Sequence, residues 1–221
     1  MTSKKFPIQK ELDKDDIMVV MGDWGAIWYG NRKDNYLLKW WNDKPWTTFV
    51  VLGNHENYDA IERLPITYKF GGRVRCAAPT VFLAITGEIY DLNGYECLVV
   101  NGAESHDIVD ASGKPYRKEG ISWWPQEKIK KEDIDNALTK AYYFPDGIDF
   151  AFSHTGGSEV NRFLGFYPTE SDYELDRVLG LVPFKKHFCG HYHEDMWIGD
   201  TRIVYNDIIE IHDELRRDAD D

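Results

Sequence analysis

The sequence predicts an α/β (α+β) protein, and three patterns indicate this class. Up to Arg63, short apolar runs alternate with stretches of helical periodicity, as in one half of a parallel sheet. Residues 68–100 change to β-branched and aromatic runs separated by Gly-containing pairs, which is typical of an antiparallel meander. Beyond residue 126, two further helical stretches each precede a short apolar run. We therefore expect parallel and antiparallel strands with helices packed against them.

The first half of the chain supplies two strands and three helices. The run Ile17–Met21 is apolar throughout, which favours a strand in the interior of a sheet. Four apolar residues recur at helical spacing before Lys44-Pro45 ends their helix, namely Tyr36, Leu37, Trp40 and Trp41. The expected elements are a short helix at 6–12, strands at 17–21 and 47–52, and helices at 33–43 and 57–63.

The second half begins with the meander and returns to alternating helices and strands. Asn93-Gly94 lies between two apolar runs and is a strong hairpin signal. Residues 102–126 are polar and irregular, and Pro125 suits the first turn of the following helix. That helix is expected to carry four apolar residues on one side, Ile129, Ile134, Leu138 and Tyr142. The expected elements are helices at 127–143 and 173–181, strands at 149–153 and 186–189, an irregular loop at 156–170, and one or two closing strands within 196–211.

Length, charge and cysteine content narrow the class of protein. The 221 residues are expected to form a single domain, 1–221, with a charged and frayed tail at 213–221. The net charge of −12 disfavours extended nucleic acid and anionic lipid as partners. The apolar stretches are too short to span a membrane, and the polar N-terminus has no signal-peptide core. Three widely spaced cysteines indicate reduced thiols in a cytoplasmic protein, Cys76, Cys97 and Cys189.

Side chains with metal-binding or acid–base chemistry directly follow four of the expected strands. Gly22-Asp23 follows the first strand, and Gly53-Asn54-His55-Glu56 follows the second. Ser153-His154 and Gly190-His191-Tyr192-His193 end two later strands. Because open α/β sheets bind ligands at the carboxyl ends of their strands, we expect these side chains to gather at one edge. Their nitrogen and oxygen donors suit Mn²⁺, Fe or Zn²⁺.

This order of motifs resembles the calcineurin-like metallophosphoesterase superfamily. The resemblance extends from Ile17 to Tyr205, and its specific part is Gly-Asn-His-Glu followed by Gly-His-x-His. It implies a four-layer α-β-β-α sandwich of two mixed sheets flanked by helices, with two divalent metal ions. It also implies hydrolysis of a phosphate mono- or diester by a metal-activated hydroxide. Many relatives carry a second acid where this chain has Ala26, and the aromatic Trp24 beside Asp23 is seen in a phage- and Firmicute-like subgroup.

The resemblance also assigns the metal ligands. Asp23 would bridge both ions, because a carboxylate offers two oxygens to ions about 3.5–4 Å apart. Asn54, His154 and His191 would complete one site, and His193 would belong to the other. Mn²⁺ is the expected metal, with Fe, Zn²⁺ or Ni²⁺ as alternatives. Each residue also has a plainer reading: Asp23 and Asn54 suit ordinary turns, and the histidines suit the surface.

His55 is expected to be catalytic and not a metal ligand. In the family, this histidine faces the substrate phosphate and protonates the leaving oxygen or stabilises transition-state charge. Glu56 either orients the His55 ring or interacts with the dipole of the following helix. Residues of the irregular loop are open to substrate clamping, packing or surface roles, namely His106, Arg117 and Trp123-Trp124. Structural roles are expected for His187 and His212.

One family motif, Asp-x-His on a first strand, does not occur before Asp23, since His55 is the first histidine. Asp13, Asp15 and Asp16 precede the first expected strand, so they should lie at its far end as solvated turn residues. A start site assigned too late and a natural loss are both open explanations. With two ligands left for the second ion, we expect one firm metal site and one weak or empty site. We also expect an exposed sheet edge that a partner or an oligomer would cover.

Two functions follow from these patterns. The first is a metal-dependent phosphoric ester hydrolase. The alternative is a catalytically impaired relative that binds metal or phosphate and acts as an interaction module. Substrates in the family range from phosphomonoesters of proteins to cyclic nucleotides, dinucleotide polyphosphates and nucleic acids, so the expected partner is a phosphate-ester substrate.

Overall fold

The structure is a computed structural model that describes residues 6–110 and 112–211. The expected tail at 213–221 and His212 lie outside these residues. The strands are β1 (Ile17–Met21), β2 (Thr47–Val51), β3 (Ile66–Lys69), β4 (Gly72–Ala78), β5 (Val81–Ala84), β6 (Ile89–Leu92), β7 (Tyr95–Val100), β8 (Ile148–Ser153), β9 (Phe184–Cys189), β10 (Met196–Ile198) and β11 (Thr201–Ile203). The helices are α1 (Arg32–Asn42), α2 (Tyr58–Ile61), α3 (Lys131–Ala141), α4 (Gly157–Phe163) and α5 (Glu170–Leu181), with 3₁₀ turns η1 (Pro7–Lys10) and η2 (Pro125–Glu127).

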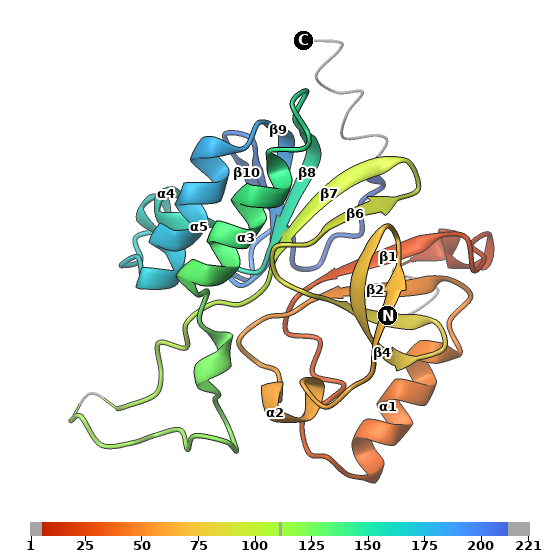
Figure 1. Cartoon of the computed structure of the whole chain (residues 1–221). Coiled ribbons are helices and arrows are strands. Elements are labelled where there is room, and N and C mark those ends of the chain that lie inside the picture. Colours follow the sequence, from red (N-terminus) through yellow and green to blue (C-terminus); the bar gives the residue numbers. More distant parts are fainter. Residues whose placement is uncertain (1–5, 111, 212–221) are drawn as a thin grey trace.

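Two mixed sheets form the centre of the molecule (Figure 1). The five-stranded sheet has the order β1-β2-β5-β4-β3, and the six-stranded sheet has the order β10-β11-β9-β8-β7-β6. Strands β1, β2 and β5 are parallel, as are β7, β8, β9 and β11. The remaining pairings are antiparallel. The two sheets and the flanking helices confirm the expected α/β sandwich.

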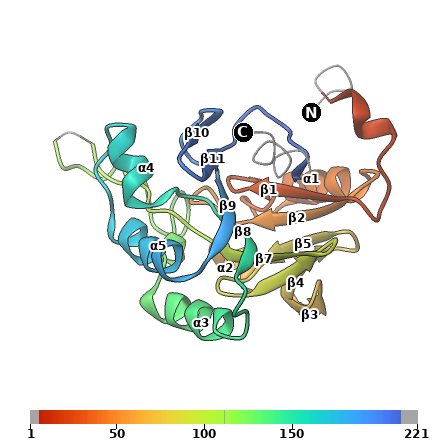
Figure 2. The same cartoon turned by 90° about the horizontal axis from the view of Figure 1, so that it is seen from above.

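The molecule has four layers of secondary structure, namely helices, the two sheets and helices, and an apolar layer lies between each neighbouring pair (Figure 2). Between the sheets, phenylalanines from both sides pack together, Phe49 and Phe82 against Phe150, Phe152 and Phe188. Helices α1 and α2 cover the outer face of the five-stranded sheet, with Leu37, Trp41 and Ile61 in contact. Helices α3 and α5 cover the other sheet through Ile134, Leu175 and Val178. Strand β2 is therefore buried on both faces, which explains its continuous burial.

Strand β1 has the expected bounds but not the expected interior position. It pairs only with β2 and forms an edge of its sheet, and all five of its residues are half-buried. Its apolar run has another cause, because Val19 and Met21 pack between the sheets while Val20 packs on the α1 side. The run is therefore apolar because both faces of β1 are covered, although β1 lies at the edge of its sheet.

Three other expectations need correction. The helix expected at 127–143 begins only at Lys131. The Ile129 N–H donates to the Ser171 hydroxyl, and the backbone is extended at the residues before and after Ile129. Tyr142, expected on the apolar side of this helix, is exposed. The loop expected at 156–170 contains α4, whose Ser158 N–H is bonded to Asp176 of α5. The meander is divided, since β3–β5 join one sheet and β6–β7 join the other.

The expected hairpin and the structural role of His187 are confirmed. Asn93 and Gly94 both have positive φ and connect β6 to β7 as a tight hairpin. His187 is fully buried, with its ring nitrogens bonded to the hydroxyls of Ser153 and Thr201. The three cysteines are free. Within the described residues, no helix is long and apolar enough to cross a membrane.

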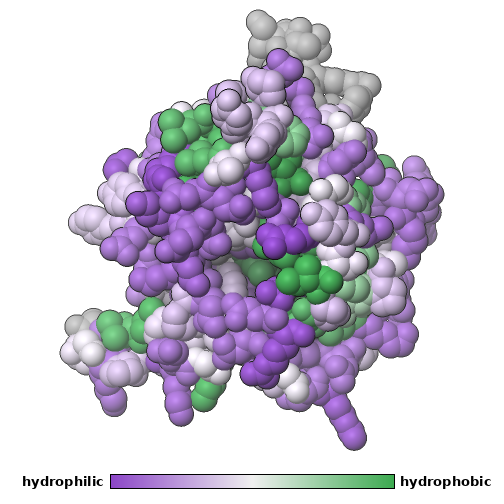
Figure 3. All heavy atoms as spheres, viewed as in Figure 1, coloured by the Kyte–Doolittle hydropathy of each residue, from purple (hydrophilic) through white to green (hydrophobic). Residues whose placement is uncertain are grey.

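Hydrophilic side chains cover most of the face in Figure 3, with hydrophobic ones beside the hollow at its centre.

Candidate metal centre

The turns after β1, β2, β8 and β9 meet at one end of the sandwich. Asp23 Oδ1 lies 3.2 Å from His154 Nε2 and accepts a hydrogen bond from the His55 backbone N–H at 3.0 Å. His191 Nδ1 lies 3.3 Å from His154 Nε2. The structure thus brings together Asp23, His154 and His191 from three strand ends, as the motif order predicts.

Glycines make this close approach possible. A Cβ on Gly53 would lie 2.4 Å from Asp23 Oδ1 and 2.8 Å from His154 Nε2. A Cβ on Gly22 would lie 2.0 Å from His154 Nδ1, and one on Gly190 would lie 2.4 Å from the Met21 carbonyl oxygen. Because each distance is far below a van der Waals contact, any side chain at these positions would push the site apart. The glycines of the motifs are therefore required by the packing of the site itself.

The backbone and the charges of the site are also unusual. Asp23, His191 and His193 have positive φ values of 49°, 70° and 57°, a region that costs non-glycine residues energy and is found at functional sites. Burial opposes ionisation of Asp23, yet His154 and His55 hold the pKa of its carboxyl well below the usual range. Burial lowers the pKa of His191 to about 3, and His154 adds to the effect. Asp23 is thus an anion in a site where the His191 imidazole is neutral.

Asn54 presents a buried acceptor that the protein leaves unused. The Asn54 amide nitrogen donates to Ser105 Oγ at 3.1 Å, while its carbonyl oxygen Oδ1 is buried and has no hydrogen-bond partner. His154 Nδ1 donates to the Met21 carbonyl at 2.7 Å, which directs its Nε2 toward Asp23 Oδ1. Since buried polar atoms are nearly always satisfied, the Asn54 oxygen indicates a place for a cation.

The donors present fit one divalent ion better than two. Aspartate, asparagine and imidazole are ligands suited to Mn²⁺, Fe and Zn²⁺. In residues 6–110 and 112–211, no three His, Cys, Asp or Glu side chains form a closed metal cluster. Asp23, His154 and His191 instead form a chain of contacts, which the Asn54 amide oxygen would complete. His193 stands apart, because its ring stacks on Tyr205 at 4.6 Å between centroids.

His55 lies beside this group and is held by an aromatic ring and a cation. Its ring stacks on Trp28 at 6.2 Å between centroids, and Trp28 packs edge-on against Trp124. Its Nε2 lies 3.3 Å from Arg117 Nη2. Burial lowers the pKa of His55, the Arg117 guanidinium lowers it further, and Asp23 opposes both. A neutral imidazole is therefore favoured in this arrangement.

Glu56 takes neither of the two roles considered from the sequence. Its carboxylate accepts hydrogen bonds from the backbone N–H groups of Trp24 and Gly25, at 2.7 and 3.3 Å. The side chain is fully buried, and burial raises its pKa to about 8. Glu56 thus holds the turn that presents Asp23.

Comparison with known proteins identifies a family for the chain. Residues 3–195 match the family described as Calcineurin-like phosphoesterase. The chain belongs to this family. Its members typically bind divalent metals and act on phosphate esters. A search of curated proteins gave no match to the chain.

Tyr192 lies at the candidate site of this family member, and sequence reasoning gave it no role. Its hydroxyl contacts Thr155 Oγ1 at 3.0 Å and accepts from the Gly156 N–H and the Asn161 amide, both at 2.9 Å. Thr155 in turn donates to Asp172 of α5 at 2.5 Å. The available signal in the sequence was its place between two candidate ligands.

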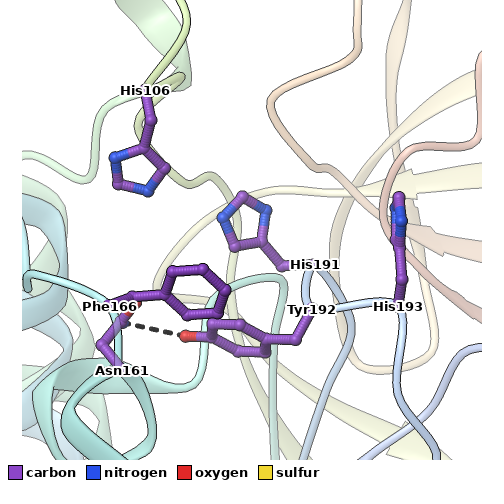
Figure 4. Close-up of a pocket in the computed structure, with 6 residues that line it drawn as sticks. All are labelled: His106, Asn161, Phe166, His191, Tyr192 and His193. Atoms are coloured by element: carbon purple, nitrogen blue, oxygen red, sulfur yellow. Dashed lines mark hydrogen bonds between the residues drawn. The ribbon is translucent and has the colours of Figure 1, made fainter. Parts of the chain in front are cut away.

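A pocket of about 260 Å³ opens beside the centre and is lined by His106, Asn161, Phe166, His191, Tyr192 and His193. In Figure 4, His106 and His191 face one another above the Phe166 and Tyr192 rings, while His193 lies on the other side. The His106 and His191 ring centroids are 6.0 Å apart. Of the loop residues with open roles, His106 and Arg117 therefore lie at the site, whereas Trp124 packs in the core.

Proposed function

We propose that this chain is a metal-dependent hydrolase of a phosphate mono- or diester, of the phage- and Firmicute-like subgroup. The buried and unpartnered Asn54 Oδ1 beside the Asp23–His154–His191 chain is the observation that carries the proposal. An asparagine oxygen left without a partner in a buried, anionic corner is explained by a cation that it would help to hold.

The roles of the residues follow from their positions. Asp23, Asn54, His154 and His191 would hold one ion firmly, with Mn²⁺ the first candidate and Fe, Zn²⁺ or Ni²⁺ the alternatives. A divalent ion in this place supplies neutralisation of phosphoryl charge and lowers the pKa of water. His55 adjoins Asp23 without joining the donor set, so its ring is available to the substrate, where it would protonate the leaving oxygen or stabilise transition-state charge.

One observation favours the second candidate function, a catalytically impaired relative that binds metal or phosphate. His193 stacks on Tyr205, and within the described residues no hydrogen bond or ion pair joins it to Asp23, so the second ion would have at most two protein ligands. A weak or empty second site would leave binding intact while limiting turnover.

Hydrolysis assays with Mn²⁺ separate the two candidates. The chain is assayed on a chromogenic phosphodiester and on the matching monoester, with His191→Ala to remove a candidate ligand and Tyr173→Phe, on the exposed side of α5, as the control. Turnover that is lost in His191→Ala and kept in Tyr173→Phe supports the hydrolase. Folded protein that binds Mn²⁺ but cleaves neither ester would sink the hydrolase and favour the binding module.

A further inference from the structure

The long segment between β7 and η2 leaves the body as an arm (Figure 1), yet one of its side chains returns to the site. Arg117 Nη2 lies 3.3 Å from His55 Nε2 and donates to Asp107 Oδ2 at 2.7 Å. The Arg117 side chain is only 12% exposed, whereas that of Asp107 is 51% exposed. A buried cation is thus held at the candidate catalytic histidine by a partner that is half in water.

Only Arg117 can donate the hydrogen bond in its contact with His55. A guanidinium carries donors and no acceptor, so His55 Nε2 must accept and its proton must reside on Nδ1. Arg117 Nη1 also donates to the Ser122 carbonyl oxygen at 3.3 Å, so the donors open to an anion are the one that now meets Asp107 and the remaining N–H groups. Within the described residues, five other arginines have side-chain bonds to partners elsewhere in the fold, namely Arg73, Arg75, Arg162, Arg177 and Arg202. In a chain of net charge −12, a guanidinium held beside His55 points to an anionic ligand at this place.

We propose that Arg117 binds the phosphoryl group of the substrate, and that phosphoryl oxygens replace the Asp107 carboxylate on its guanidinium. The inference rests on the proposed function, because it takes a phosphate ester as the ligand of the site. Carboxylate and phosphate offer the same paired oxygens to the planar guanidinium, so one can stand in for the other. Asp107 gives up little on leaving, since a half-exposed ion pair contributes little stability.

This exchange gives Asp107 and Arg117 opposite effects on phosphate affinity. Removing the guanidinium deletes the anion's partner. Removing the charge of Asp107 deletes the competitor and leaves Arg117 in place. A purely structural pair would behave differently, because losing either partner would disturb the arm in the same direction.

Binding of inorganic phosphate tests the inference without turnover. Isothermal titration with phosphate is carried out on the Mn²⁺-loaded full chain and on Arg117→Ala, Arg117→Lys and Asp107→Asn. Arg177→Ala controls for loss of an arginine on the far helix α5, and Glu119→Gln controls for loss of an exposed acid in the same arm. We expect Arg117→Ala to weaken phosphate binding about tenfold or more, Arg117→Lys to weaken it less, and Asp107→Asn to tighten it several-fold.

Each outcome bears on Arg117 separately from hydrolysis. Phosphate affinity within twofold of wild type in Arg117→Ala, or equal weakening in Arg117→Ala and Asp107→Asn, would overturn the inference. The expected opposite shifts would support it even if the wild-type chain cleaved no ester, in which case the hydrolase proposal alone would fail. Wild-type turnover with an unchanged KM in Arg117→Ala would leave the hydrolase standing and reject the role of Arg117.

Discussion

The carboxylate of Glu56 accepts a hydrogen bond from the backbone N–H of Trp24, 2.7 Å away, and so joins the turn after β2 to the turn after β1. The Gly25 N–H donates to the other carboxyl oxygen at 3.3 Å. Between these turns, the His55 N–H donates to Asp23 Oδ1. The two motifs are thus joined by reciprocal hydrogen bonds, in which a side chain of each motif is bonded to the backbone of the other.

This relationship predicts that Glu56→Ala weakens metal binding although Glu56 is not a ligand. The change strands two backbone N–H groups in a buried turn and leaves a cavity, which should cost about 2–4 kcal/mol of stability. Glu56→Gln keeps an oxygen for the Trp24 N–H and should retain most of both properties. Urea denaturation and Mn²⁺ titration measure the two effects, and wild-type Mn²⁺ affinity in folded Glu56→Ala would contradict the role.

A second prediction concerns Gly53. Because a Cβ there would lie 2.4 Å from Asp23 Oδ1, Gly53→Ala must displace Asp23, His154 or both. Mn²⁺ affinity should fall about 10–100-fold, as when ligands lose the groups that position them. Gly180→Ala on α5 is the matched control, since its added methyl would meet nothing within 4 Å. If Gly53→Ala bound Mn²⁺ as tightly as Gly180→Ala, the proposed donor set would be wrong.

The sequence predicted the parts of the fold that depend on local pattern and position in the chain. Strand β1 was predicted to the residue, because its apolar run is bounded by acidic residues on one side and a Gly-Asp turn on the other. Helix α4 was missed, because Gly156 and Gly157 indicate a loop and the bond from the Ser158 N–H to Asp176 comes from a distant helix. Long-range contacts of this kind leave no periodic trace.

The candidate site was likewise predicted only in part from the sequence. The glycine-bearing motifs indicated which strand ends would meet, since parallel strands bring their carboxyl ends to one edge. They did not indicate that Ser105 would orient the Asn54 amide, or that Arg117 would reach His55, because both lie in the irregular loop after β7. Nor did the spacing of His191 and His193 show that their rings would diverge, which depends on the left-handed backbone at both residues.

Tyr192→Phe should loosen the metal centre without unfolding the protein. The change removes the hydroxyl that accepts from the Gly156 N–H and the Asn161 amide, while the ring that fills the site remains. The turn that carries His191 would lose its tie to α4 and α5, so Mn²⁺ affinity should fall about 10–100-fold. Tyr173→Phe on the exposed side of α5 is the control. Equal Mn²⁺ affinity in the two variants would show that the hydroxyl does not position the histidines.

The last prediction tests stability against pH at a site far from the metal centre. Glu88 Oε1 lies 2.7 Å from Arg73 Nη2 and 2.7 Å from Lys140 Nζ, and its side chain is 6% exposed. Burial favours the protonated acid, but Lys140 and Arg73 outweigh it and lower the pKa of Glu88 below 4.5. A lowered pKa gives stability that is present above the unfolded value and is lost as the pH falls through the folded one.

Glu88→Gln should therefore be less stable than wild type at pH 7, by about 1–3 kcal/mol, and the difference should shrink between about pH 5 and pH 3. Urea denaturation of metal-free protein across this range measures it. Glu96→Gln is the control of opposite sign, because burial and the neighbouring Asp91 and Asp149 raise the pKa of Glu96. Removing that acid should relieve a penalty that grows as the pH rises. A Glu88→Gln difference that stayed constant from pH 7 to pH 3 would mean that the ionised carboxylate contributes nothing beyond its shape.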